Sequence, residues 1–397
     1  PGAGLEGGAR APIVVQVQSE PQGAGLFING RLVGPTPFAW RDVRPGDYGL
    51  RLEKAGHEPG SWVARVGREP LVLRERLAPL KTGILEVDVL LLQVAPTNER
   101  GEYSLSIAHD YLIPALEAAR VVIAEVNEQA PWTCGERPVL ETDLDYIVRS
   151  SRPPLELVHP QAGTAELAIA RHVAGLIEDG ATLQFGLGAL PEVILAALAD
   201  RRDLGVHSGA IGDQVAALMQ AGVINNAKKS IDRGASVAGI MFGSKRLHDF
   251  AHRNPQIQFR SSAYTHGPSV LAQIERFTAL NSAVEVDLSG QINAEVAAGV
   301  YVGAVGGAVD FLRAAHYSKG GLPIVALAST AGRHSRIVAK LNGPVSTPRS
   351  DAGIIVTEYG VADLRGATLS ERARRMIAIA HPDQREQLAR DSREKGG

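Results

Sequence analysis

Two hydrophobic patterns divide the chain near residue 80. Between Ile13 and Leu77, short alternating or apolar runs are separated by turn signals such as Asn29-Gly30. This pattern predicts a small antiparallel β sandwich. Beyond residue 83, nearly continuous apolar runs such as residues 87–94 alternate with stretches at helical spacing, such as residues 164–177. The second pattern predicts open, mostly parallel sheets with helices on both faces.

These patterns suggest four segments. Residues 1–11 are rich in Gly and Ala and are predicted to be disordered. Residues 12–80 form the predicted β sandwich, residues 81–150 a first α/β segment, and residues 160–397 a second one. The prolines between residues 131 and 160 predict a long loop, partly ordered from Leu140 to Val148, at the boundary between the two α/β segments.

The stretch Leu183-Gln-Phe-Gly-Leu-Gly-Ala-Leu-Pro191 predicts a strand, a glycine turn and a helix opened by Pro191. Gly186 and Gly188 permit backbone angles that other residues avoid, and they leave backbone N–H groups bare. A helix start of this kind favours an anion. On these residues alone, a tight connection without a ligand is equally well supported.

Composition and charge narrow the function classes. The net charge of −2 argues against a surface for nucleic acid, and no apolar run approaches the roughly 18 residues of a membrane span. The single cysteine, Cys134, excludes an intrachain disulfide and a cysteine-built zinc site, and favours the cytoplasm. His248 and His252 lie four residues apart but lack a metal-site glutamate, so we interpret them as a solvated helix face and expect no metal.

The β segment resembles a PEGA domain, a module associated with binding or attachment. The resemblance covers about residues 12–79 and rests on four stretches in the order S-x-P-x-G-A, I-N-G, G-x-T-P and P-G-x-Y. No residue of this segment is expected to be catalytic.

The remainder, about residues 83–390, resembles the acetyl-CoA hydrolase/transferase family, which includes 4-hydroxybutyrate CoA-transferase. The ordered blocks that carry the resemblance include Gly101-Glu-Tyr-Ser-Leu105, Asp179-Gly-Ala-Thr-Leu-Gln184, Gly303-Ala-Val-Gly-Gly-Ala-Val-Asp-Phe311 and Thr357-Glu-Tyr-Gly360. The resemblance implies two facing α/β halves with coenzyme A, as acyl-CoA, bound between them. It assigns CoA binding to Gly186, Leu187, Gly188, Ala189, Leu190, Val284, Gly307 and Lys319.

Two departures from the family weaken this assignment. The family's nucleophilic glutamate lies in a block of the form H-S/T-E-M-x-x-D, and Gly209 occupies its place in His207-Ser-Gly-Ala-Ile-Gly-Asp213. Glycine has no nucleophile, so the catalytic residue is left unassigned. The family's first half also carries roughly a hundred additional residues before the stretch that begins near Gly83, so the first half is expected to be truncated here.

Several residues could take over catalysis. Glu285 and Asp287 share one face of a predicted strand, while His207 and Asp213 flank Gly209. Water activated by His207 or Glu285 would hydrolyse the thioester. For both His207 and Glu285, a purely structural role is the favoured interpretation.

The expected function is CoA transfer between short-chain carboxylic acids or thioester hydrolysis, with acyl-CoA and a carboxylate as small-molecule partners. A non-catalytic CoA-binding or interaction protein is the alternative, and a homo-oligomer is allowed by either.

Overall fold

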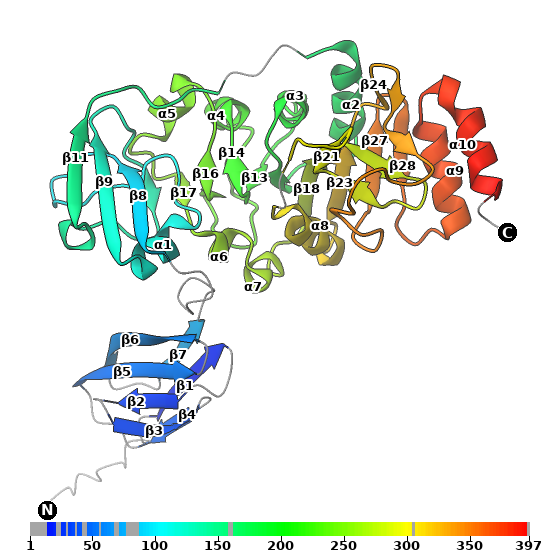
Figure 1. Ribbon diagram of the computed structural model, residues 1–397. Coiled ribbons are helices and arrows are strands. Elements are labelled where there is room, and N and C mark those ends of the chain that lie inside the picture. Colours follow the sequence, from blue (N-terminus) through cyan, green and yellow to red (C-terminus); the bar gives the residue numbers. More distant parts are fainter. Residues whose placement is uncertain are drawn as a thin grey trace, which may run out of the picture. The chain divides into compact units, whose positions relative to one another are not determined.

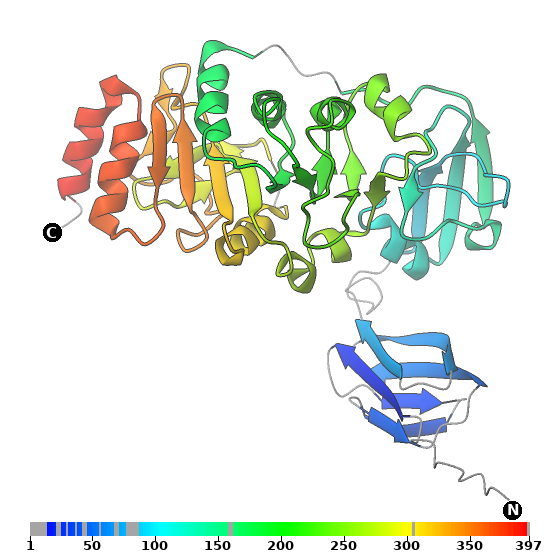
Figure 2. The same cartoon turned by 180° about the vertical axis from the view of Figure 1, so that it is seen from behind.

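The computed structural model describes residues 14–20, 25–28, 31–35, 38–41, 46–54, 57–66, 71–76, 87–157, 162–303 and 306–394. The chain divides into two compact units, one comprising residues 1–91 and 113–123 and the other residues 92–112 and 124–397. Figure 1 colours the chain along its sequence, and Figure 2 gives the opposite view. The segment predicted to be disordered lies outside the described residues.

Two small sheets form the N-terminal β domain, with strand orders β4-β1-β7 and β3-β2-β5-β6. Their strands are β1 (Val14–Glu20), β2 (Gly25–Ile28), β3 (Arg31–Pro35), β4 (Phe38–Arg41), β5 (Gly46–Lys54), β6 (His57–Val66) and β7 (Leu71–Arg76). Val17 of one sheet and Leu26, Leu50 and Leu52 of the other are buried. The all-β prediction is confirmed, although β1 and β7 pair in parallel and the domain is therefore not wholly antiparallel.

A second three-stranded sheet has the order β11-β9-β8. The elements of this region are β8 (Val89–Val94), α1 (Leu112–Ala118), β9 (Val121–Asn127), β10 (Cys134–Gly135), the 3-10 helix η1 (Glu141–Asp143) and β11 (Tyr146–Ser150). Within residues 131–160, η1 and β11 overlap the stretch 140–148 that was predicted to be partly ordered, and the two-residue strand β10 is an addition to that prediction.

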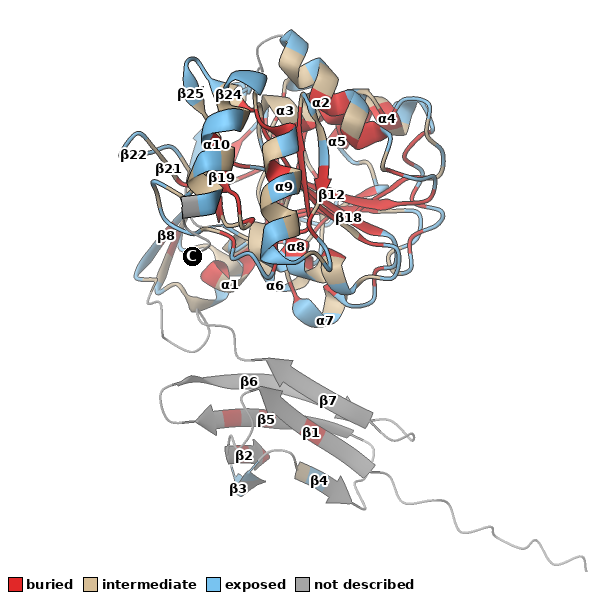
Figure 3. Cartoon of the chain, turned by 90° about the vertical axis from the view of Figure 1, so that its right-hand side faces the viewer, coloured by how far each residue is buried: buried red, intermediate tan, exposed pale blue. Residues whose placement is uncertain are grey.

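The central sheet has six strands in the order β13-β12-β18-β23-β27-β28. They are β12 (Thr182–Phe185), β13 (Gly205–Val206), β18 (Phe277–Ser282), β23 (Leu322–Ala326), β27 (Ile354–Thr357) and β28 (Gly360–Asp363). All are parallel except the edge strand β28. Figure 3 shows how deeply β12 and β18 are buried, as expected for strands covered on both faces.

Helices cover both faces of this sheet (Figure 1). Leu280 and Ile324 pack on one face with α2 (Thr164–Ala174) and α3 (Ala189–Ala196). Ala279 and Val325, their neighbours along the same strands, pack on the other face with α8 (Ala308–Tyr317) and α9 (Leu369–Ile379). This alternation follows from the two-residue period of a strand and confirms the predicted α/β architecture.

Smaller elements complete the second unit. The helices are α4 (Asp213–Gln220), α5 (Lys245–Ala251), α6 (Ser262–Thr265), α7 (Pro268–Leu271) and α10 (Pro382–Glu394). The short strands are β14 (Ala210–Ile211), β15 (Ser236–Ala238), β16 (Ile240–Met241), β17 (Ile257–Phe259), β19 (Glu285–Asp287), β20 (Ile292–Asn293), β21 (Val296–Ala297), β22 (Val300–Tyr301), β24 (Thr330–Ala331), β25 (His334–Ser335) and β26 (Ile337–Val338).

The strand order contains a switch point beside β12. From β12 the chain crosses to β13 on one side and later returns to β18 on the other. In open α/β sheets, ligands bind beyond the carboxyl ends of the strands at such a point. The glycine turn that follows β12 lies at this edge.

Candidate functional site

The glycine turn joins β12 to α3 at the carboxyl edge of the sheet. The Gly186 N–H donates to the Leu280 carbonyl over 2.8 Å, which ties the turn to β18. Gly188 precedes α3 with a φ of 128°, a region that favours glycine, and a β-carbon there would meet no described atom within 4 Å. Leu187 is half exposed. The helix begins at Ala189, two residues before the predicted start, with the buried Pro191 in its first turn.

Gly209 lies at the same edge as this turn. Its neighbour Ser208 is buried and donates its hydroxyl to the Phe185 carbonyl over 3.2 Å, directly before Gly186. The two stretches that the sequence singled out therefore meet at the ends of β12 and β13.

His266 fills the space in front of Gly209. A β-carbon built on Gly209 would lie 3.2 Å from Cε1 and 3.3 Å from Nε2 of His266. A β-carbon on Gly307 would lie only 2.3 Å from the same Nε2, so this glycine is required where it packs on the ring. The imidazole also stacks on Phe311 of α8, with 4.5 Å between ring centroids. Gly209, Gly307 and His266 thus form one cluster.

Electrostatics favour a neutral His266. Desolvation lowers its pKa, while Asp310 and Asp110 act in the opposite direction. Burial raises the pKa of Asp110, whose N–H donates to the Gly239 carbonyl. A β-carbon on Gly239 would lie 3.0 Å from the Gly209 carbonyl oxygen and 3.3 Å from the Asp110 β-carbon, which places Asp110 beside the same cluster.

A cavity of about 720 Å³ opens beside Val284, directly after β18. Glu285, His334 and Arg336 also line it. The Arg336 guanidinium donates to the carbonyls of Ala283 and Val284, and burial lowers its pKa. A fixed cation therefore lies beside the predicted CoA contact.

Lys319 is separate from this group. It lies between α8 and β23, and its carbonyl accepts from the Arg276 N–H, directly before β18 begins. The six-residue strand β18, about 20 Å long, separates that edge from Val284. The structure therefore gathers Gly186 to Leu190, Val284 and Gly307 at the carboxyl edge and leaves Lys319 at the amino edge, in a second cavity of about 420 Å³.

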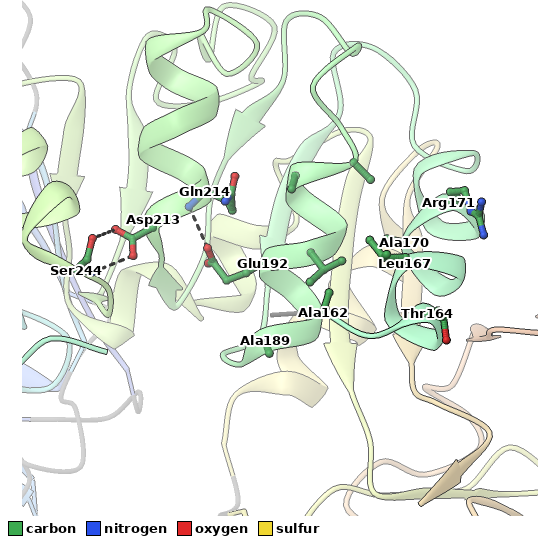
Figure 4. Close-up of a pocket in the computed structure, with 13 residues that line it drawn as sticks. Ala162, Thr164, Leu167, Ala170, Arg171, Ala189, Glu192, Asp213, Gln214 and Ser244 are labelled. Carbon is green, nitrogen blue, oxygen red and sulfur yellow. Dashed lines mark hydrogen bonds between the residues drawn. The ribbon is translucent and has the colours of Figure 1, made fainter. Parts of the chain in front are cut away.

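A larger cavity of about 910 Å³ lies among α2, α3 and α4, with Ala189 in its wall (Figure 4). Glu192 accepts from the Gln214 N–H over 3.0 Å, and Asp213 accepts from the Ser244 N–H and hydroxyl over 2.9 and 2.8 Å. These carboxylates occupy the starts of α4 and α5, where a phosphate would otherwise be favoured. Asp213 therefore has a structural role.

The two strand carboxylates are also engaged in structural hydrogen bonds. Glu285 accepts from the N–H groups of Asn342 and Gly343 and from two asparagine amides. Asp287 accepts from the backbone and side chains of Ser289 and Gln291. Although Glu285 borders the cavity beside Val284, the oxygens of both carboxylates are engaged in these hydrogen bonds, and we assign both a structural role.

His207 is buried as well. Its Nε2 donates to the Thr265 carbonyl over 3.0 Å, while its Nδ1 lies 4.0 Å from Asp232 without a hydrogen-bond partner among the described residues. Desolvation is the largest of the effects that lower its pKa to about 4. The basic nitrogen therefore faces the protein interior rather than a ligand.

The histidine pair of α5 differs from expectation. His248 is buried, so the prediction of a solvated face is wrong for this residue, and His252 accepts from the Trp132 N–H.

Among the described residues, no three His, Cys, Asp or Glu side chains are grouped to hold a metal ion. Within the same residues no helix is long and apolar enough to cross a membrane.

Comparison with known proteins connects this geometry to a family. The profile of the acetyl-CoA hydrolase/transferase C-terminal domain matches residues 243–392, and that of the PEGA domain matches residues 13–69. A 4-hydroxybutyrate coenzyme A transferase from Clostridium kluyveri is 44% identical over 315 residues, covering 78% of this chain and 73% of that protein. The chain belongs to the acetyl-CoA hydrolase/transferase family. The predicted family and PEGA resemblances are confirmed.

Other members of the acetyl-CoA hydrolase/transferase family agree with this placement. A butyryl-CoA:acetate CoA-transferase from Anaerostipes caccae is 38% identical, covering 77% of this chain and 72% of that protein. The crystal structure of a 4-hydroxybutyrate CoA-transferase from Porphyromonas gingivalis superposes with a TM-score of 0.73 at 38% identity, covering 81% of each chain. The family acts on CoA thioesters, so acyl-CoA is the substrate class.

Sequence reasoning missed three side chains: His266 and Asp110 beside the glycines, and Arg336 beside Val284. His266 belongs to a short segment between α6 and α7 and carries no motif, so only tertiary packing brings it to Gly209. Asp110 has a left-handed φ of 22°, which a strand or helix pattern does not predict. Arg336 lies half-buried between β25 and β26, where a guanidinium partly removed from water needs carbonyl partners.

Proposed function

We propose that this chain binds a short-chain acyl-CoA at the carboxyl edge of β12, β13 and β18 and cleaves the thioester with water. Family membership supports the CoA thioester, and the open backbone at Gly188, before the start of α3, supports a contact with its phosphate or pantetheine portion. The CoA contacts at Leu187, Ala189, Leu190, Val284 and Gly307 remain part of this proposal. CoA binding by Lys319 also remains a prediction. Lys319 lies at the amino edge of the sheet, away from the other predicted contacts.

The observation that carries the choice of hydrolysis is Gly209. A carboxylate nucleophile would form an anhydride and then an enzyme thioester that passes CoA to a second acid. At the position where the family resemblance places this carboxylate, Gly209 offers only backbone, and its carbonyl accepts from the N–H groups of Gly239 and Ile240. Without the covalent intermediate, water is the simplest acceptor.

The test measures release of free thiol from acetyl-, propionyl- and butyryl-CoA, with and without added acetate. We expect release without acetate and no increase when acetate is added. Acetate-dependent formation of acetyl-CoA from butyryl-CoA would instead show that transfer persists without the glutamate. Binding of CoA by calorimetry with no release from any thioester would favour a non-catalytic CoA-binding protein.

The same proposal extends to the setting of the reaction. We propose a cytoplasmic enzyme whose partners are acyl-CoA and the released carboxylate. The near-neutral net charge of −2 supports small-molecule partners over nucleic acid. Sedimentation at several protein concentrations tests the homo-oligomer.

A further inference from the structure

The imidazole of His266 takes the place that a side chain at residue 209 would need. Its Nε2 would lie 3.3 Å from a β-carbon on Gly209 and 2.3 Å from one on Gly307. The nitrogen therefore lies between the position vacated by the family's carboxylate and the glycine turn that opens α8. His266 is also half-buried, whereas His207 and His109 are buried.

Thr265 lies within hydrogen-bond distance of both the His266 ring and the Ser261 carbonyl. Its hydroxyl oxygen is 2.8 Å from Nδ1 of His266 and 3.3 Å from the Ser261 carbonyl oxygen. We assign the hydroxyl hydrogen to the Ser261 carbonyl, so that the oxygen accepts from Nδ1–H. In this tautomer the lone pair is on Nε2, the nitrogen that faces both glycines.

The charged groups around His266 come from three elements. Asp310 belongs to α8, Asp110 precedes α1, and the buried His207 follows β13. The two carboxylates favour protonation, but burial of the ring outweighs them and keeps its pKa below 6.5. At pH 7 the ring is neutral and able to accept a proton, as a general base requires.

Building on the proposed function, we infer that His266 is the general base of thioester hydrolysis and substitutes for the missing glutamate. Nε2 removes a proton from water as the water oxygen bonds to the thioester carbonyl carbon. The tetrahedral intermediate then expels CoA by breaking the carbon–sulfur bond. The imidazolium returns the proton to the sulfur, leaving the carboxylic acid and CoA thiol. No oxidant or second substrate is needed.

The test compares His266→Gln with His172→Gln, which changes a half-buried histidine of α2 that has no part in the cluster. Glutamine keeps much of the volume of imidazole but is not basic. We expect His266→Gln to lower kcat by at least about 100-fold, the typical lower range for loss of a general base, while Kd for CoA changes little. His172→Gln should retain the wild-type rate.

The pH dependence of kcat in the wild type distinguishes a general base from a residue with a purely structural role. We expect kcat to fall below a midpoint under pH 6.5 as His266 becomes protonated, because the base is present only above its pKa. Asp110→Asn removes a negative charge and should shift the midpoint further toward acid. A flat wild-type profile between pH 5 and 8 would overturn the assignment, even if His266→Gln did not fold.

The two proposals fail separately. A folded His266→Gln that hydrolyses thioesters at the wild-type rate overturns the role of His266 and leaves the function intact. A wild-type chain that releases no CoA from any thioester overturns the function, and the role of His266 with it.

Discussion

At the scale of single residues, the absence of a side chain at two positions decides the chemistry. Gly209 removes the covalent route, and Gly307 allows an imidazole to lie against the start of α8. Acidic residues elsewhere do not compensate, since Glu285 and Asp287 use their oxygens to hold loops. Of the side chains described above, His266 is the one that reaches the space in front of Gly209.

Gly209→Glu tests whether a carboxylate works at the position that the family resemblance assigns to the nucleophile. The new β-carbon would meet His266 at 3.2 Å and Phe311 at 3.7 Å, so the ring must shift by a few tenths of an ångström. We expect a loss of about 1–2 kcal/mol of unfolding free energy from overpacking and slow acetate-dependent CoA exchange. Gly209→Ala, which adds the same contact without a carboxylate, is the control. Equal exchange in both variants would show that the carboxylate is not used.

At the scale of elements, the turn from β12 to α3 depends on one unusual backbone geometry. Gly188 has φ 128° and ψ 174°, a combination essentially confined to glycine, whereas Gly186 has no positive φ. We propose that the start of α3 contacts CoA. The position of this helix start therefore depends on the backbone angles that Gly188 can adopt.

Gly188→Ala should destabilise the protein by about 1–3 kcal/mol and weaken CoA binding, because alanine is strained in this region. Gly186→Ala is the stability control two residues away, where φ is not positive and an added β-carbon would lie 3.2 Å from Asn281 Oδ1. Urea unfolding compares the two variants, and calorimetry with CoA measures binding by Gly188→Ala. Similar losses of unfolding free energy in the two variants would contradict the backbone explanation.

Elements built from contiguous residues could be predicted from the sequence, whereas contacts between distant segments could not. The strand, turn and helix around Gly186 were predictable, because their apolar run and glycines are contiguous. Ser318-Lys-Gly-Gly321 resembles a phosphate loop in composition, yet it precedes β23 and so lies at the amino edge. His266 is 57 residues from Gly209 and 41 from Gly307 in sequence, so no periodicity could connect them.

At the scale of the whole molecule, buried neutral histidines couple stability to pH. Desolvation lowers the pKa of His109 to about 3, and desolvation together with lesser effects lowers that of His207 to about 4, from 6.5. As pH falls below 6.5, the unfolded chain binds protons that the folded chain does not. Stability is therefore complete above pH 6.5 and is lost toward pH 4.

For His207 this loss should be on the order of 3 kcal/mol by pH 4. Urea unfolding of wild type and His207→Gln at pH 7, 6, 5 and 4 measures it, with His172→Gln as a control. We expect a shallower pH dependence only in His207→Gln. The same slope in all three proteins would mean that His207 is protonated in the folded state.

The contact of His266 with both glycines also constrains how this enzyme can evolve. A single substitution that places an acid at residue 209 meets the imidazole, which must shift by a few tenths of an ångström to admit it. Because the same shift moves the proposed base, a chain that gained slow transfer in this way would do so at the expense of hydrolysis. The packing of one imidazole thus sets the two activities against each other.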